Sequence, residues 1–104
     1  MYARHLTFRS TPDNRPEIEA FAREVYELFQ NLDGFISVTF GVSEDEIEYG
    51  SFSLWETKAA AESAGKRAGE EIAPKHQKVM MTEAKVKYFE AMSPAMLSQT
   101  GQDG

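Results

Sequence analysis

The chain has 104 residues, 41% of them hydrophobic and 12% aromatic, which is enough for one compact core and short of the usual length of two domains. Its 11 Lys and Arg residues against 17 Asp and Glu residues give a net charge of -6, which argues against nucleic acid and anionic membranes as partners. There is no cysteine, so disulfides, thiolate nucleophiles, iron–sulfur clusters and Cys-type zinc sites are excluded.

A first strand is predicted at residues 2–9. Tyr2, Leu6 and Phe8 fall on one face of this segment, because side chains alternate along a strand. Arg4 interrupts that apolar face. The pattern otherwise suits a strand with one apolar side.

A helix is predicted after a turn at residues 11–15. Asn14 with Glu17 three places later forms a capping pattern, and Pro16 suits the first helical turn. Apolar residues then recur at three- and four-residue intervals and form one stripe, which we expect to be core: Ile18, Phe21, Ala22, Val25, Leu28, Phe29 and Leu32. Gly34 ends the helix, since glycine accepts the left-handed conformation common just past a helix end.

Two further strands are predicted at residues 35–42 and 49–55, joined as an antiparallel hairpin by an acidic loop. In the first of them, one face is expected to hold Ile36, Val38, Phe40 and Val42, and the other Ser37, Thr39 and Gly41. In the second, one face is expected to hold Gly50, Phe52 and Leu54, and the other Tyr49, Ser51, Ser53 and Trp55.

The last third of the chain predicts a second helix and a fourth strand. Thr57 is placed to cap a helix over residues 58–68, and a bend or break is expected near Gly69. Pro74 opens a short helical segment, and residues 83–89 alternate as a strand.

The resulting order, β-α-β-β-α-β, is that of an α+β ferredoxin-like fold, in which two helices cover one face of a four-stranded antiparallel sheet. We expect one domain over residues 1–92 and a flexible tail at residues 93–104, and no membrane span or signal peptide, hence a cytoplasmic protein. The sheet has aromatic residues on both faces and helices for only one, which predicts a homodimer. A monomer with half-exposed aromatic residues is the alternative.

Several short motifs occur in a recognisable order. They are Tyr-Ala-Arg at 2–4, Thr-Phe-Arg at 7–9, Thr-Pro at 11–12, Leu-Asp-Gly-Phe at 32–35 and Ser-Leu-Trp-Glu-Thr at 53–57. By their order and spacing the sequence resembles the antibiotic biosynthesis monooxygenase family over about residues 2–92. The resemblance implies a dimeric α/β barrel. It also implies oxidation of quinols or phenols by molecular oxygen, without a metal or flavin cofactor.

The family has more than one chemistry, and its motifs match this chain unevenly. Its quinol-oxidising members are similar in placing a Trp at the end of the third strand, which matches Trp55, with an Asn four residues earlier. Here that earlier position is Ser51, which offers one hydroxyl in place of an amide. Its haem-degrading members carry an Asn in the first strand, a Trp in the second helix and a haem-ligating His. Only His76 lies near a match to these, which makes haem degradation the weaker branch.

Two histidines are the natural candidates for a catalytic base. His5 and His76 are the only side chains whose unperturbed pKa lies near neutrality, although each could equally be structural. Two histidines alone make a poor metal site, so no metal is expected.

The predicted substrate contacts lie on one strand face. Trp55 is expected either to stack on a flat substrate or to anchor the core, and Tyr49, Ser51 and Ser53 share its face. Taken with these residues, the family resemblance implies a cofactor-independent monooxygenase acting on a small hydroxylated aromatic compound, with Ser51 and Trp55 positioning it. The alternative is a non-catalytic dimeric barrel protein that binds a small apolar or aromatic ligand or has a regulatory role.

Overall fold

The computed structural model describes residues 1–95 and 97, and it has the predicted order of strands and helices. The elements are β1 (Tyr2–Arg9), α1 (Arg15–Phe29), β2 (Phe35–Val42), β3 (Glu48–Trp55), α2 (Lys58–Glu71) and β4 (Lys85–Glu90), with short 3₁₀ segments η1 (Pro12–Asn14) and η2 (Ala73–Val79). The α+β ferredoxin-like fold is therefore confirmed.

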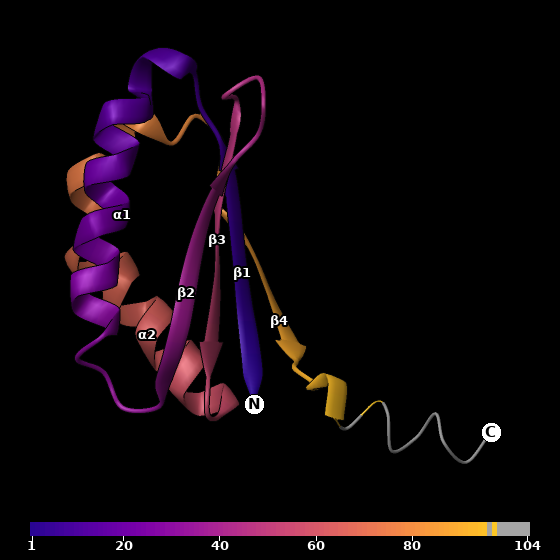
Figure 1. The fold of residues 1–104 in the computed structure, drawn as a ribbon. Coiled ribbons are helices and arrows are strands. Elements are labelled where there is room, and N and C mark those ends of the chain that lie inside the picture. The colour runs from indigo at the N-terminus through magenta and orange to yellow at the C-terminus, as the bar shows by residue number, and fades with distance from the viewer. Residues whose placement is uncertain (96, 98–104) are drawn as a thin grey trace.

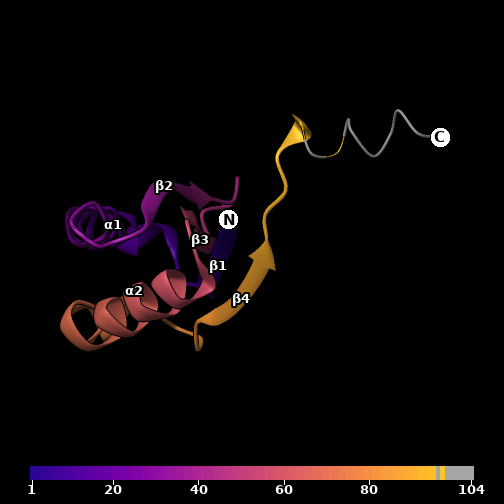
Figure 2. The same ribbon diagram turned by 90° about the horizontal axis from the view of Figure 1, so that it is seen from below.

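The four strands form one antiparallel sheet in the order β2-β3-β1-β4. Both helices lie on the same side of this sheet, and in the view from below in Figure 2 neither α1 nor α2 covers the other side. In Figure 1, α1 runs alongside the sheet while α2 crosses behind β2 and β3. The sheet therefore has a helix-covered face and an open face.

Strand register assigns the side chains to these two faces. On the helix-covered face, β1 residues stand opposite β3 residues in the pairs Leu6 with Ser51, Arg4 with Ser53 and Tyr2 with Trp55. Directly opposite residues of an antiparallel pair point to the same side. The predicted grouping of Tyr49, Ser51, Ser53 and Trp55 on one face of β3 is therefore confirmed.

Two apolar clusters fill the space between the helices and the sheet. One surrounds Trp55 and consists of Val25, Phe29, Ala61, Ala64, Ala68 and Ile72. The other consists of Phe8, Ile18, Tyr49 and Val79. The stripe of α1 contributes to both, as its spacing predicts. The small residues of α2 let this helix approach the Trp55 end of the sheet closely.

The predicted N-terminal cap is absent at α1 and present at α2. The Asn14 side chain makes no capping bond, and its amide instead donates to the Ser10 hydroxyl at 3.0 Å. The predicted capping pair with Glu17 is therefore wrong. Thr57 does cap α2, accepting a bond from the Ala60 amide at 3.1 Å. Gly34 has a φ of 81°, the left-handed conformation expected of it.

Two further details of the elements depart from the sequence pattern. The predicted break near Gly69 is wrong, because α2 continues to Glu71 and its next residue, Ile72, is buried in the core. A bulge between Phe35 and Ser37 shifts the alternation of β2. Phe35 thereby packs on Trp55 from the covered face, while Ile36 stays 43% exposed.

The described part of the chain leaves the predicted C-terminal tail untested. The predicted tail, residues 93–104, lies largely outside the described residues, since 96 and 98–104 are not among them. The division into a domain at residues 1–92 and a tail therefore stays a prediction. Within the described residues, no helix is both long and apolar enough to cross a membrane.

Candidate functional site

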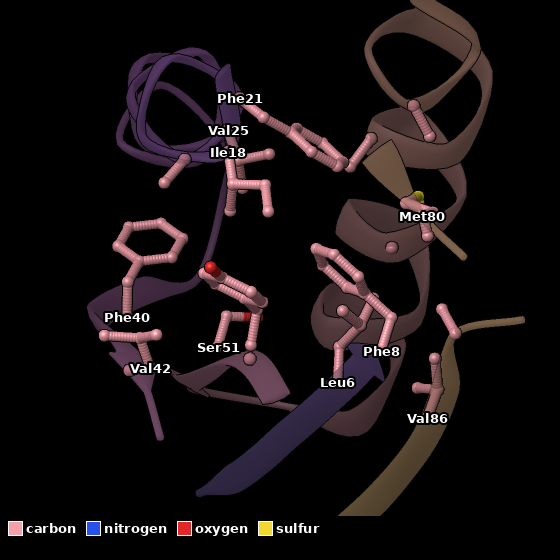
Figure 3. A pocket seen from close by; sticks show the side chains of 18 of the residues that line it. Leu6, Phe8, Ile18, Phe21, Val25, Phe40, Val42, Ser51, Met80 and Val86 are labelled. Carbon is pink, nitrogen blue, oxygen red and sulfur yellow. The ribbon is translucent and has the colours of Figure 1, made fainter. Parts of the chain in front are cut away.

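A cavity of about 380 Å³ lies between the helices and the covered face of the sheet. Figure 3 shows its walls closing from several elements, with Ile18, Phe21 and Val25 of α1 facing Leu6 and Phe8 of β1. Further apolar walls come from Phe40, Val42, Met80 and Val86. A chamber of this size with mostly apolar walls is the usual form of a small-molecule site.

Ser51 brings a hydroxyl to this cavity from the middle of β3. None of the hydrogen bonds within the described residues uses that hydroxyl, so it is available to a ligand. Tyr49 lines the same wall, and its hydroxyl donates to the Thr11 carbonyl at 3.1 Å. Burial raises the pKa of the Tyr49 phenol above its usual value, which keeps it neutral. Two of the predicted contact residues are thus brought together at the cavity.

Ser53 and Trp55 lie deeper and do not line the cavity. Both are fully buried, and the Trp55 indole nitrogen donates to the Ser53 hydroxyl at 2.9 Å. The indole packs edge-on against Phe29 and Phe35, with ring centroids 5.0 and 5.3 Å away. In this geometry Trp55 anchors the core, one of the two roles that its sequence position predicts.

His76 lies behind the cavity wall formed by Phe21. The imidazole is buried and stacks on the Phe21 ring at 4.8 Å. Its Nε2 lies 2.5 Å from Glu24 Oε2, and its Nδ1 lies 3.3 Å from Glu17 Oε2. Both ring nitrogens are therefore engaged by carboxylates of α1. The two carboxylates hold opposite nitrogens, and the described residues contain no group of three ligands placed to hold a metal ion.

His5 lies on the opposite side of the sheet from the cavity. Its ring is 5.7 Å from that of Phe52, and both line a second, more open hollow of about 280 Å³ on the open face. The two candidate bases are therefore separated by the sheet. In the described part of the chain, neither histidine lines the cavity of about 380 Å³, whereas His5 lines the second hollow together with Ser51.

Among the described residues, three charged residues line the cavity, Arg4, Arg15 and Glu19. In the sequence, Arg4 is noted only as an interruption of the apolar face of the first strand. Arg15 lies at the wall and pairs with Glu19 and with Glu46. Arg4 also lines the cavity, is only 6% exposed, and its Nε has no hydrogen-bond partner among the described residues. A charged residue on an otherwise apolar strand face was the signal in the sequence.

Comparison with known proteins finds no matching family model and no matching curated protein. Solved structures do match. A candidate antibiotic biosynthesis monooxygenase from Nitrosomonas europaea has a TM-score of 0.78 at 13% identity, over 89% of this chain and 91% of that one. SnoaB, a cofactor-independent oxygenase from Streptomyces nogalater, has a TM-score of 0.71 at 16% identity, over 88% and 94%.

A third match is ActVA-Orf6, a monooxygenase from Streptomyces coelicolor solved with the ligand nanaomycin D. Its TM-score is 0.65 at 18% identity, over 89% of this chain and 91% of that one. The chain has the fold of the antibiotic biosynthesis monooxygenases. The fold that the sequence motifs predict is thereby confirmed, and the similarity extends over about nine tenths of each of these solved structures. At identities this low, the fold is common to these proteins while each residue's role has to be argued from its own surroundings.

Proposed function

We propose that the protein is a monooxygenase of the antibiotic biosynthesis monooxygenase type, acting without a cofactor on a small hydroxylated aromatic compound. The observation that carries this proposal is the cavity of about 380 Å³ between helices and sheet. Its walls are mainly apolar and aromatic, which suits a flat ring system, and Ser51 supplies a hydroxyl among them. The similar fold of SnoaB, described as a cofactor-independent oxygenase, supports the reaction class.

In such a reaction the substrate itself supplies the electrons. A base removes the acidic proton of a phenol or quinol, and the resulting electron-rich anion reduces molecular oxygen. One oxygen atom enters the product, and the other leaves as water with two substrate hydrogens. The protein has to bind the anion, hold it in place and exclude bulk water.

The predicted residues divide into contact and supporting roles. We assign substrate contact to Ser51 and Tyr49, because both line the cavity. Ser53 and Trp55 are supporting residues, since their mutual hydrogen bond fixes the end of β3 inside the core. The base stays a prediction. His76 is the candidate that adjoins the cavity, through its stack on Phe21, and it has to release a carboxylate before it accepts a substrate proton.

The second candidate function is a non-catalytic module that holds a small ligand in the same cavity. The observation in its favour is that neither His5 nor His76 lines the cavity within the described residues. Ser51, which stands where the quinol-oxidising relatives carry an amide, points the same way. We do not expect His76 to ligate haem, because both of its ring nitrogens already lie beside the carboxylates of Glu17 and Glu24.

Oxygen uptake with a panel of dihydroxyaromatic compounds tests the reaction. We expect turnover by the wild type, a loss in Ser51→Ala, and a gain in Ser51→Asn if the amide improves the hydrogen bonds to the substrate. Binding of the same compounds without oxygen uptake would establish the non-catalytic module instead. A Soret titration with haem, expected to show no shift, checks the third branch.

We also propose that the protein is a homodimer joined through the open face of the sheet. Phe52 and Phe89 are each 45% exposed on that face, with His5 beside Phe52. Exposed aromatic side chains grouped on a sheet face are stabilised by burial against a second surface. In that arrangement His5 and the second hollow become part of a chamber between two copies.

A further inference from the structure

Arg4 brings a positively charged side chain to the wall of the cavity. Its side chain comes from the middle of β1, is only 6% exposed and lines the cavity. It takes part in none of the ion pairs of the described residues, and its buried Nε has no hydrogen-bond partner there. A guanidinium has five donors and stays charged, so removing it from water without partners costs free energy.

Arg4 is packed between the neighbouring strands and α2, and no carboxylate of the described residues forms an ion pair with it. In the sheet Arg4 stands between Ser53 and Tyr88, directly opposite both. On the helix side it lies against Gly65 of α2, so closely that a Cβ on Gly65 would come within 2.6 Å of Nε. The glycine therefore makes the space that the guanidinium occupies.

The other charges of the cavity wall do not neutralise Arg4. Of the charged side chains lining it in the described part of the chain, Arg15 and Glu19 pair with each other. A second carboxylate, that of Glu46, also pairs with Arg15. The unpaired charge in the cavity is thus positive, in a protein whose net charge is -6. Such a chamber favours an anion, and the apolar wall around it strengthens the attraction.

We propose that Arg4 binds the anionic oxygen of a flat aromatic ligand, either a carboxylate or an ionised phenol. Charge-assisted bonds from a guanidinium to a carboxylate or a phenolate are short and strong, and the planar fork can present two donors together. Leu6 and Phe8, which follow Arg4 on the same face of β1, line the apolar part of the chamber (Figure 3). Residues of β1 would therefore contact both the negative charge and the aromatic rings of the ligand. The inference rests on the proposed use of this cavity for a ligand and specifies its chemical class.

For a phenolic substrate, this contact also serves the proposed reaction. A nearby positive charge favours the ionised form of the phenol, whose proton passes to a base or to solvent. The phenolate is the electron-rich form that reduces oxygen. Arg4 is then a binding residue that also holds the reactive ionisation state.

The test compares two ligands that differ only in charge. 2-Naphthoate and its neutral amide, 2-naphthamide, are titrated against the protein preloaded with the neutral fluorescent probe N-phenyl-1-naphthylamine. We expect the wild type to bind the carboxylate roughly tenfold or more tightly than the amide, as a charge-assisted bond in a buried site implies. Arg4→Met should remove that preference while retaining the amide and the probe. Arg4→Lys should keep part of it.

Arg67→Met is the matched control. It removes the same charge from α2, where Arg67 is exposed and pairs with Glu71, and should leave the preference unchanged. A wild type without preference, or an Arg4→Met variant that keeps it, overturns the inference. Retained probe binding by Arg4→Met shows that the variant has folded.

The outcomes also separate this inference from the proposed function. If none of the three compounds binds the wild type, the cavity is no ligand site and both proposals fall. If 2-naphthoate binds through Arg4 but no oxygen is consumed with the dihydroxyaromatic panel, the proposed reaction is wrong and the proposed anion site is retained. A second readout is 2-naphthol, whose ionised fraction at a fixed alkaline pH should be larger when bound to the wild type than to Arg4→Met.

Discussion

The Trp55 indole nitrogen donates a hydrogen bond of 2.9 Å to the Ser53 hydroxyl, and both side chains are fully buried. Ser53 in turn lies 3.4 Å from the carbonyl oxygen of Arg4, so the hydroxyl links β3 to β1. A buried indole N–H requires a partner, because leaving it unpaired costs the free energy of its lost hydration. Ser53 satisfies Trp55 two residues away on the same strand.

Replacing Ser53 by alanine should therefore destabilise the protein by about 1–3 kcal/mol, since the indole N–H then has no acceptor. Urea denaturation followed by Trp fluorescence measures this. Ser51→Ala, on the same face of β3 but facing the cavity, should change stability by about 0.5 kcal/mol or less. Equal effects of the two substitutions would show that the hydrogen bond does not contribute as described.

Two glycines of α2 provide a matched pair of substitutions. A Cβ at Gly69 meets nothing within 4 Å, so Gly69→Ala should stabilise the helix by about 0.5–1 kcal/mol. Gly65→Ala brings the same helical gain, but its Cβ displaces the Arg4 guanidinium. We expect Gly65→Ala to be the less stable of the two in thermal unfolding and to weaken 2-naphthoate binding. A Gly65→Ala variant as stable as Gly69→Ala would mean that Arg4 moves away freely.

Arg4→Met should raise the melting temperature in the absence of ligand. The substitution removes a buried charge that forms no ion pair within the described residues, and it keeps much of the side-chain volume, for a gain of about 1–3 kcal/mol. Differential scanning calorimetry measures it, with Arg67→Met as the control from which no such gain is expected. Unfolding of Arg4→Met at a lower temperature than the wild type would indicate that Arg4 is a structural residue.

Acid should destabilise the contact between η2 and α1 through Glu24. Hydrogen bonds from Lys75, at 2.6 Å, and from His76 lower the pKa of the Glu24 carboxyl below 4.5. Because the folded pKa lies below the unfolded one, the stabilisation is present above pH 4.5 and is lost as the pH falls through the folded value. Glu24→Gln should lower stability at neutral pH and flatten the acid dependence. Glu27→Gln, on the same helix, should leave the acid dependence as in the wild type.

The homodimer is tested by light scattering at micromolar concentration. We expect the wild type at twice the chain mass of 11.7 kDa, and Phe52→Lys at the single-chain mass, because a charge on the open face opposes its burial. Phe40→Lys is unsuitable as a control since Phe40 lines the cavity, whereas Tyr26→Lys changes an exposed ring of α1 on the helical side. A wild type that scatters as a single chain removes the dimer.

Most helices and strands, and the sheet face on which many of their side chains lie, could be predicted from local sequence patterns. Strand alternation and the three- and four-residue stripe are local properties of the backbone period, so β1, β2 and the placement of Tyr49, Ser51, Ser53 and Trp55 could be predicted. A cap at Thr57 and a left-handed Gly34 follow from the chemistry of single residues.

Which of these residues meet at the cavity depends on contacts between segments that are far apart in the sequence. Whether Trp55 is wall or core depends on Phe29 and Phe35, which come from other elements. The two histidines lie on opposite sides of the sheet. A local sequence pattern does not indicate which side of the sheet holds the ligand cavity. Arg4 stood out in its strand as an irregularity. Its proposed role depends on its forming no ion pair within the described residues, which follows from how distant segments pack together rather than from any short segment.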